Sequence, residues 1–266
     1  MTSEPAGPLS PEVLDRENRR LTRRLQRLED NVRRLEEFQD SNSTLLSRLL
    51  AELEEERAKS QRLLLNVLPQ RIIDRLGAGE TLIADRHEEV SVLFSDFVGF
   101  TAISASLTPA VLIEELNELF SRFDAICERT GVEKIKTVGD AYLVIGGLGG
   151  ETDHAAAIAE TAIQMVEQIG QTSGHAADWR IRIGLHGGPV VAGVIGTTKF
   201  SYDVWGDTVN VAARLETASE PNHIRVSVTL ASRLEGRRFR LGPHRAVELR
   251  GKGLVETCCL LGRGDS

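Results

Sequence analysis

The apolar positions of this chain follow two different periods, and the change falls near Pro69. From Leu14 to Leu68 there is no glycine or proline, and leucine or valine recurs with a seven-residue spacing. Beyond Pro69 the apolar residues gather in short runs that are separated by glycine-containing turns. A sustained heptad pattern is typical of a long helix, and short apolar runs are typical of buried strands. The pattern therefore predicts a long helix followed by a globular domain.

The heptad segment predicts a parallel, two-stranded coiled coil over residues 13–68. With position a at Asn18, leucine fills six of the eight d positions, but the seam is polar around Asn42 and around Glu56. Leucine at d and asparagine at one a position favour a parallel dimer in fixed register. Two interpretations of these polar seam residues stay open. They either only set the register, or they allow the coil to shift between two packings and so transmit a signal. Residues 1–12 hold three prolines and are expected to be disordered.

The chain beyond Pro69 predicts an α+β domain. Residues 69–87 form a linker with a short helix over 70–76, and a domain over 88–262 follows. Its helix after Thr108 begins with proline at the first helical position, which is a favourable start. The order of elements predicts a mixed sheet with helices on one face. We expect strands at 90–95, 132–137, 141–145 and 179–186, helices at 109–128, 155–169 and 208–218, a glycine-rich excursion up to residue 196, and two or three final strands.

Composition and charge exclude several classes of protein. The chain has 32 basic and 39 acidic side chains, and this net charge of -7 argues against nucleic acid as a partner, because phosphate backbones require a basic surface. No apolar run reaches the roughly 18 residues of a membrane span, and no secretory signal follows Met1. The three cysteines lack metal-ligand spacing. We therefore expect a cytoplasmic protein with free thiols.

Asp96 is a candidate metal ligand in Phe94-Ser-Asp-Phe-Val-Gly-Phe-Thr101. It ends a predicted buried strand and is followed by a turn and a helix. The backbone N–H groups of Val98, Gly99, Phe100 and Thr101 suit phosphate oxygens, and the carboxylate suits the Mg²⁺ that accompanies a polyphosphate. Taken alone, an aspartate at a strand end is more often a helix cap or a turn former.

A second aspartate, in Lys136-Thr-Val-Gly-Asp140, strengthens the metal hypothesis. If 132–137 and 141–145 form a hairpin beside the first strand, Asp140 lies next to Asp96. Two converging carboxylates are costly without cations. Two metal ions bridging them would stabilise both the attacking and the leaving oxygen of a phosphoryl transfer.

A third motif, Tyr202-Asp-Val-Trp-Gly-Asp-Thr-Val-Asn-Val-Ala-Ala-Arg214, presents an amide and a guanidinium together. Asn210 and Arg214 are separated by four residues, so one helix face carries both. Arginine is well suited to the charge that builds up on a phosphoryl group in reaction. By itself the motif is also compatible with an ordinary exposed polar helix face.

With these three motifs in this order, residues 88–262 resemble the class III nucleotidyl cyclases, the family of the adenylyl and guanylyl cyclases. The resemblance is greatest to homodimeric bacterial adenylyl cyclases. It implies a ferredoxin-like mixed sheet with helices, and the conversion of ATP into 3′,5′-cyclic AMP and pyrophosphate. It also implies two Mg²⁺ (or Mn²⁺) ions per active site, held by Asp96, Asp140 and the carbonyl of Phe97.

The resemblance assigns the remaining roles residue by residue. Asn210 and Arg214 match the pair that positions the ribose and stabilises the transition state, and Lys136 and Asp203 match the purine-selecting pair. The triphosphate-binding lysine of the family corresponds to Arg250, a departure that keeps the charge and changes its geometry. Lys252 stays open as the alternative.

The purine pair favours ATP over GTP. Lysine can donate to N1 of adenine and aspartate can accept from its amino group, whereas the guanylyl branch of the family has a carboxylate in place of the lysine. In the family, one domain supplies the metal aspartates and the other supplies the purine pair, asparagine and arginine. This chain carries both sets, so the resemblance implies a homodimer with two equivalent sites, and the coiled coil would bring the domains together.

Two other functions stay open: a guanylate or mixed-specificity cyclase, and a non-catalytic nucleotide-binding signalling dimer. The regulatory signal is not encoded in any motif that we recognise. We hypothesise that the coil sets the angle between the two catalytic domains, acting for an upstream sensor protein or domain.

Overall fold

The computed structural model describes residues 11–65, 67–171, 176–196, 198 and 200–264. The chain divides into two compact units, residues 1–66 and residues 67–266. Residues 1–10 of the segment predicted to be disordered lie outside the described residues, whereas Pro11 and Glu12, which we also expected to be disordered, belong to a helix.

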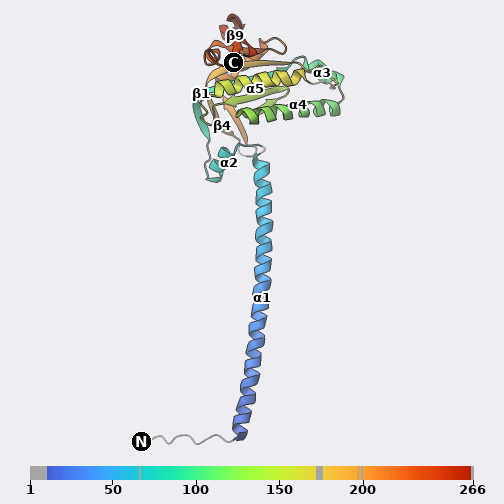
Figure 1. The fold of residues 1–266 in the computed structure, drawn as a ribbon, viewed down its shortest axis with the longest axis vertical. Coiled ribbons are helices and arrows are strands. Elements are labelled where there is room, and N and C mark those ends of the chain that lie inside the picture. Colours follow the sequence, from blue (N-terminus) through green and yellow to red (C-terminus); the bar gives the residue numbers. More distant parts are fainter. Residues whose placement is uncertain (1–10, 66, 172–175, 197, 199, 265–266) are drawn as a thin grey trace, which may run out of the picture. The chain divides into compact units, whose positions relative to one another are not determined.

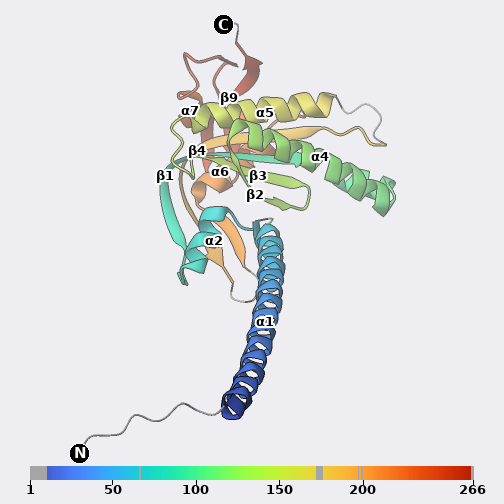
Figure 2. The same ribbon diagram turned by 60° about the horizontal axis from the view of Figure 1, so that its bottom comes forward.

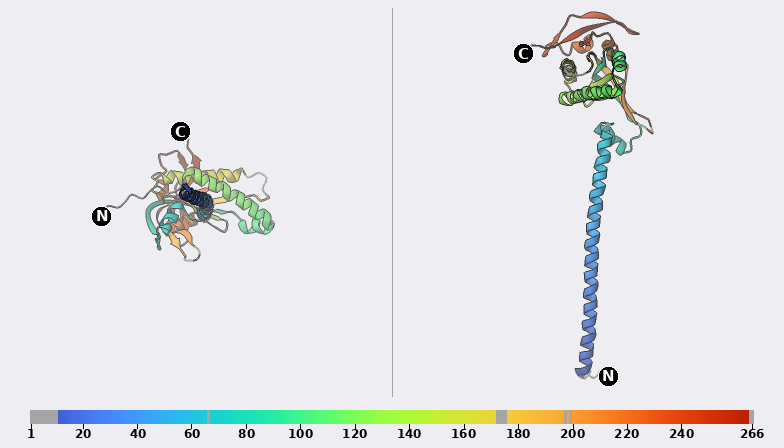
Figure 3. Two further views of the ribbon diagram at one scale, coloured as in Figure 1. Left: turned by 90° about the horizontal axis from the view of Figure 1, so that it is seen from below. Right: turned by 90° about the vertical axis from the view of Figure 1, so that its right-hand side faces the viewer.

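The first unit is one long helix, α1 (Pro11–Leu65), which is continuous in Figures 1 and 3. The predicted long helix is therefore confirmed, although it ends three residues before the expected boundary. Its d-position leucines are exposed in the single chain; Leu21, Leu28 and Leu35 expose 49%, 53% and 66% of their surface. Such a stripe of exposed leucines is what a coiled-coil partner would cover, and the pairing itself stays a prediction. No helix in the described ranges is long and apolar enough to cross a membrane.

The second unit is built on a nine-stranded mixed sheet with the order β2-β3-β1-β4-β6-β9-β7. β5 pairs with β4, and β8 pairs with β9, outside this path. All neighbours are antiparallel except β4 and β6, which are parallel. The strands are β1 (Ala84–Phe97), β2 (Glu133–Val138), β3 (Ala141–Gly146), β4 (Ile181–Ile195), β5 (Ser201–Trp205), β6 (Ile224–Ser227), β7 (Phe239–Leu241), β8 (Arg245–Leu249) and β9 (Gly253–Arg263). The α+β class is confirmed.

One face of the sheet is covered by α4 (Pro109–Thr130) and α5 (His154–Gly170), which lie side by side in Figure 2. Thr108 caps α4 through its side chain, and proline follows at the first position, as expected. The apolar faces of these helices pack on Leu93, Phe97 and the other inward residues of the central strands. A short helix, α3 (Phe100–Ser106), connects β1 to α4.

The expectation that helices cover only one face is wrong. Ala212 of α6 (Asp207–Thr217) and Ile72 of α2 (Gln70–Gly77) join a second core cluster with Val90 and Val92 of β1. In β1 these valines alternate with Leu93, which faces the helices of the other layer. Both faces of the sheet are thus buried, and α6 carries its polar residues on the second face. α7 (Val228–Ala231) is a single short turn after β6.

The stretch that we expected to be a glycine-rich excursion is instead the second half of the long strand β4, and β5 pairs with it. Its glycines allow close packing rather than turns: a Cβ on Gly193 would lie 2.4 Å from the carbonyl oxygen of Ile83. At the other end, β1 begins at Ala84, and Leu68 and Ile72 are buried in the same unit. The short helix α2 therefore belongs to the packed globular unit.

Candidate active site

Two aspartates meet at one end of the sheet, where the sequence places the metal site. Asp96 is the penultimate residue of β1, and Asp140 lies in the tight turn between β2 and β3. β3 pairs with β1 in a register that sets Tyr142 opposite Ser95, so the turn lies beside the end of β1. The Asp96 carboxyl is close enough to Asp140 to raise the pKa of Asp140. The hairpin that the sequence predicts is confirmed.

The electrostatics of this pair fit a cation site. Burial raises the pKa of Asp140 to about 6, and the hydrogen bond and the charge of Asp96 act in the same direction. Backbone N–H groups of Asp140 and Phe97 partly offset this rise. A carboxylate whose pKa is raised by burial and by a neighbouring carboxylate is stabilised in its charged form when a divalent cation binds beside it.

Arg182 is a neighbour of this pair that the sequence reasoning missed. It is paired with Asp96 across β1 and β4, and its Nη2 lies 3.3 Å from Oδ2 of Asp96. Its Nε donates to Glu216 of α6 at 2.8 Å. Burial raises the pKa of Glu216, which is only 4% exposed, while the Arg182 charge opposes this effect. Arg182 thus holds Asp96 and links it to α6; an arginine alternating with buried strand residues was the only signal in the sequence.

The oxygen ligands at the end of β1 suit a divalent metal, but the protein side chains there do not fill its coordination shell by themselves. Among the described residues, no group of three or more His, Cys, Asp and Glu side chains could hold a metal ion. Asp96 and Asp140 provide two carboxylates, and the carbonyl of Phe97 is a neutral oxygen next to them. Mg²⁺ commonly takes one or two carboxylates and completes its shell with water and substrate phosphates, so the two aspartates fit that cation.

The loop after β1 fits the expected phosphate contact only in part. Gly99 has φ 72° and precedes α3, whose first N–H groups have no partner within the helix. The N–H of Val98, however, already donates to the carbonyl of Arg180 at 2.8 Å. Gly99, Phe100 and Thr101 therefore stay candidates for phosphate contact through their N–H groups, and Val98 does not.

Lys136 and Asp203 come together although 66 residues separate them in the chain. Lys136 lies on β2 and Asp203 on β5, and Nζ of Lys136 is 2.5 Å from Oδ2 of Asp203. Asp203 is buried, and its Oδ1 accepts the backbone N–H of Val204 at 2.8 Å. The lysine side chain is 38% exposed, so the ammonium group remains accessible to a ligand.

The helix α6 lies on the second face of the sheet and carries both Asn210 and Arg214. Their spacing of four residues places them on one face of this helix, as the sequence predicts. Asn210 is exposed, whereas the Nη1 atom of Arg214 is buried and has no hydrogen-bond partner among the residues that the structure describes. Arg214 lies near the turn between β8 and β9, because a Cβ on Gly251 would be 3.8 Å from its Nη2. A buried guanidinium nitrogen without a partner fits an anion that is supplied by a ligand.

The same β8–β9 turn carries both candidates for the triphosphate contact. Lys252 donates from Nζ to Oδ2 of Asp207, at the start of α6, at 2.5 Å. Arg250 is exposed and has no ion pair with any residue that the structure describes. The structure thus gathers the expected residues into two pairs and one helix face, and no hydrogen bond or ion pair within the described part of the chain joins the metal pair to the purine pair.

This arrangement suits phosphate chemistry: the sheet has an acidic pair at one end, and elsewhere it carries a cationic turn and an arginine whose Nη1 lacks a partner among the described residues. Comparison with known proteins identifies the class of enzyme. The family model for the adenylate and guanylate cyclase catalytic domain matches residues 82–262. The chain belongs to this family, the class III nucleotidyl cyclases.

Individual relatives divide between the two activities. The chain is 41% identical over 222 residues to an adenylate cyclase of Mycobacterium tuberculosis strain H37Rv, covering 82% of this chain and 49% of that protein. It is 38% identical over 243 residues to retinal guanylyl cyclase 1 of Mus musculus, covering 89% of this chain and 22% of that protein. The chain thus spans half or less of the length of these relatives.

A solved structure confirms the fold. The guanylyl cyclase domain of the RhoGC fusion protein from the aquatic fungus Blastocladiella emersonii, solved as a non-canonical dimer, superimposes with a TM-score of 0.60 and 34% identity. That match covers 67% of this chain and 99% of the fungal domain. The second unit is therefore a cyclase catalytic domain.

Proposed function

We propose that this nucleotidyl cyclase is an adenylate cyclase, which converts ATP into 3′,5′-cyclic AMP and pyrophosphate. The observation that carries the choice of base is the contact between Lys136 and Asp203. An ammonium group has three donors, so Lys136 can keep its bond to Asp203 and still donate to N1 of adenine. Asp203 can accept from the amino group of adenine through a remaining lone pair. Guanine offers a donor at N1 and an acceptor at O6, and both would oppose this pair.

The chain's own residues supply the positioning for the reaction. The ribose 3′-oxygen attacks the α-phosphorus, the bond to the bridging oxygen breaks, pyrophosphate leaves, and the hydroxyl proton passes to solvent. Asn210 holds the ribose, and Arg214 meets the negative charge that develops at the α-phosphate. Asp96, Asp140 and the Phe97 carbonyl would hold divalent cations. Bound Mg²⁺ or Mn²⁺ would supply neutralisation of the triphosphate and a lower pKa for the attacking hydroxyl.

Arg250 is our candidate for the triphosphate contact. Lys252 is already paired with Asp207, and moving it to a phosphate would break that ion pair. Arg250 is exposed on the same turn and is free of ion pairs to the described residues. Its planar guanidinium can bind two phosphate oxygens at once, which an ammonium group does less well.

We further propose that the enzyme acts as a homodimer controlled through α1. The exposed leucine stripe of α1 supports this assembly. Because one chain carries both halves of the family's site, two copies would form two equivalent sites. If deleting residues 1–60 leaves the activity per dimer unchanged at equal dimer occupancy, control through the coil is refuted.

The test is to identify the product. The purified protein is incubated with ATP or GTP and with Mg²⁺ or Mn²⁺, and cyclic nucleotides are identified by mass spectrometry. We expect cyclic AMP from the unaltered protein, and its loss in Asp140→Ala. Asp178→Ala is a matched control, because that aspartate side chain is 89% exposed and pairs only loosely with Arg180. Cyclic GMP as the main product would refute the base assignment, and nucleotide binding without turnover would favour a non-catalytic signalling dimer.

A further inference from the structure

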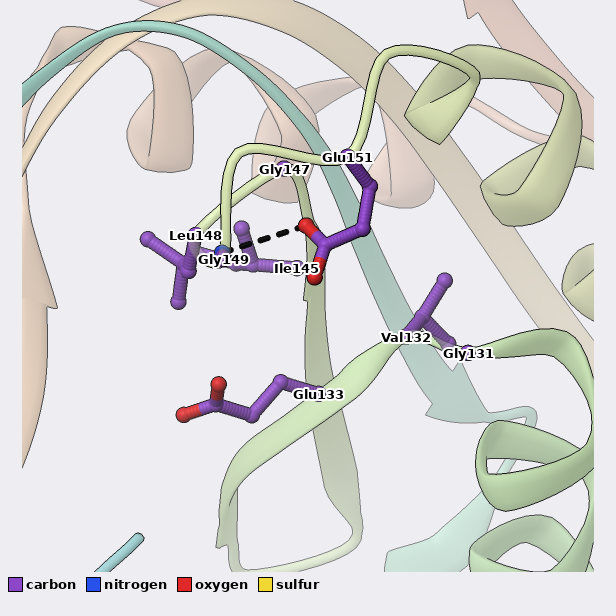
Figure 4. Close-up of a pocket in the computed structure, with 8 residues that line it drawn as sticks. All are labelled: Gly131, Val132, Glu133, Ile145, Gly147, Leu148, Gly149 and Glu151. Carbon is purple, nitrogen blue, oxygen red and sulfur yellow. Dashed lines mark hydrogen bonds between the residues drawn. The ribbon is translucent and has the colours of Figure 1, made fainter. Parts of the chain in front are cut away.

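Arg71, on the helix α2 that follows the long helix in sequence, contacts two strands at once. Its guanidinium donates to both carboxylate oxygens of Glu133 on β2, at 2.7 and 3.0 Å. The same guanidinium donates from Nη2 to the hydroxyl of Tyr202 on β5 at 2.7 Å, and it lies 5.6 Å from the centre of that ring. Figure 4 shows Glu133 at the start of β2, with its carboxylate apart from that of Glu151, which accepts the N–H of Gly149.

These two strands are the ones that carry the purine pair. Lys136 lies on β2, three residues after Glu133, and Asp203 directly follows Tyr202 on β5. β2 and β5 are not hydrogen-bonded to each other, since β2 pairs with β3 and β5 pairs with β4. The backbone therefore links Lys136 and Asp203 only through the intervening strands β3, β1 and β4, and no direct backbone hydrogen bond between β2 and β5 fixes their separation. The side-chain bridges between the two strands are the Lys136–Asp203 ion pair itself and the one through Arg71.

We propose that Arg71 is a positioning residue for nucleotide selection: by tying Glu133 to Tyr202, it sets the spacing between the strands of Lys136 and Asp203. The proposal rests on the proposed function, because it assigns a role to the same purine pair. It makes α2 more than a linker. Loss of the Arg71 contacts to Glu133 and Tyr202 would release the two base-reading strands, and affinity for the purine would change with it.

The anchoring of α2 supports this role. Ile72, next to Arg71, is 1% exposed and packs in the second core cluster with Tyr202. Tyr202 is itself buried, so its hydroxyl is held in one place. A planar guanidinium that makes two bonds to a carboxylate and one to a fixed hydroxyl restrains both distance and angle. A lysine in this position would keep the positive charge but lose the planar geometry that makes two bonds to the carboxylate.

Arg75, one turn later on α2, provides a matched control. It donates from Nε to Glu80 at 2.7 Å and also forms an ion pair with Asp85, near the start of β1. It therefore forms two ion pairs, where Arg71 forms one, but its partners lie on neither β2 nor β5. Loss of the Arg75 contacts should loosen α2 without acting on the purine pair.

The experiment compares base selectivity in Arg71→Ala, Arg71→Lys, Tyr202→Phe and Arg75→Ala. Steady-state turnover of ATP and GTP is measured together with equilibrium binding of 3′-deoxy-ATP and 3′-deoxy-GTP, which lack the attacking hydroxyl and cannot cyclise. For Arg71→Ala we expect KM for ATP to rise by about five- to tenfold and the ATP-to-GTP ratio to fall by a similar factor, with kcat at saturating ATP changed by less than about twofold. Arg71→Lys should be intermediate, and Arg75→Ala should keep the selectivity of the unaltered protein.

The outcomes separate this inference from the proposed function. An unchanged ATP-to-GTP ratio in Arg71→Ala, or an equal change in Arg75→Ala, would overturn the inference in an active cyclase. If Arg71→Ala does not fold, Tyr202→Phe, which loses only one hydroxyl, and Arg71→Lys decide the question by the same ratio. If the unaltered protein makes no cyclic product, the proposed function fails, and the ratio of 3′-deoxynucleotide affinities still tests whether Arg71 governs purine selection.

Discussion

The position of α6 against the sheet depends on the absence of a side chain at Gly184, and this can be tested with one methyl group. Gly184 lies near the start of β4 and is paired with Phe94 on β1 and with Arg225 on β6. A Cβ at this position would lie 2.2 Å from the carbonyl oxygen of Ala212 and 2.2 Å from the backbone nitrogen of Glu216. Both atoms belong to the backbone of α6, so no side-chain rotation relieves the overlap.

The size of the effect follows from these distances. Ordinary van der Waals contact begins at 3.4 Å, so Gly184→Ala forces α6 away from β4 by about 1.2 Å. Overpacking of a buried contact costs about 1–3 kcal/mol. For a folded unit of this size, that cost lowers the Tm by about 2–4 °C per kcal/mol. Because Asn210 and Arg214 move with α6, a shift of this size can also reduce turnover by about a hundredfold.

The assay combines thermal unfolding with cyclase turnover, and Gly187→Ala is the control within the same strand. A Cβ on Gly187 would meet the flexible end of Leu230 at 3.2 Å, which can yield, so we expect a clearly smaller Tm change. If Gly184→Ala keeps both the Tm and the turnover of the unaltered protein, the close approach of α6 to β4 is refuted. A lowered Tm with full turnover would show instead that α6 does not position the reacting groups.

Two other groups lead to separate predictions. Replacing Arg182 with alanine removes the cation that lies between Asp96 and the buried Glu216. Turnover should therefore fall by about a hundredfold or more, and the urea concentration at the unfolding midpoint should fall as well. Arg182→Lys should recover part of both losses. Burial lowers the pKa of His154, whose Nδ1 lies 2.8 Å from the hydroxyl of Ser91. The unfolded chain therefore binds a proton that the folded state resists, and the free energy of unfolding should fall as the pH drops below about 6.5, with a shallower slope in His154→Gln.

The sequence was most informative where the pattern is local. The heptads predicted α1, the Thr108–Pro109 start predicted α4, and the turn that ends in Asp140 predicted the hairpin that brings it beside Asp96. In each case the signal and the structure involve residues that are close in the chain. Asn210 and Arg214 share a face of α6 for the same reason.

The sequence was least informative where a residue acts through a distant partner. The glycines of β4 suggested turns, but Gly184 and Gly193 are there because other backbone segments approach them closely. Neither Arg182 nor Arg71 lies in a recognisable sequence motif, because each arginine has partners on other elements and meets them only in the folded sheet. A lone arginine in a strand or a linker has many ordinary explanations, and it gains a role only when its neighbours are known.

The two arginines support different halves of the site, and this makes their effects separable. Arg182 joins Asp96, a candidate metal ligand, to α6, while Arg71 joins β2 to β5, the strands that carry the candidate purine pair. They share no partner, and substitutions at independent sites add in free energy to within about 0.5 kcal/mol. We therefore expect Arg182→Ala to act mainly on kcat, Arg71→Ala mainly on KM for ATP, and the double variant to show the product of the two losses in kcat/KM. A loss in the double variant no larger than that of Arg182→Ala alone would mean that α2 and the metal pair act as one unit.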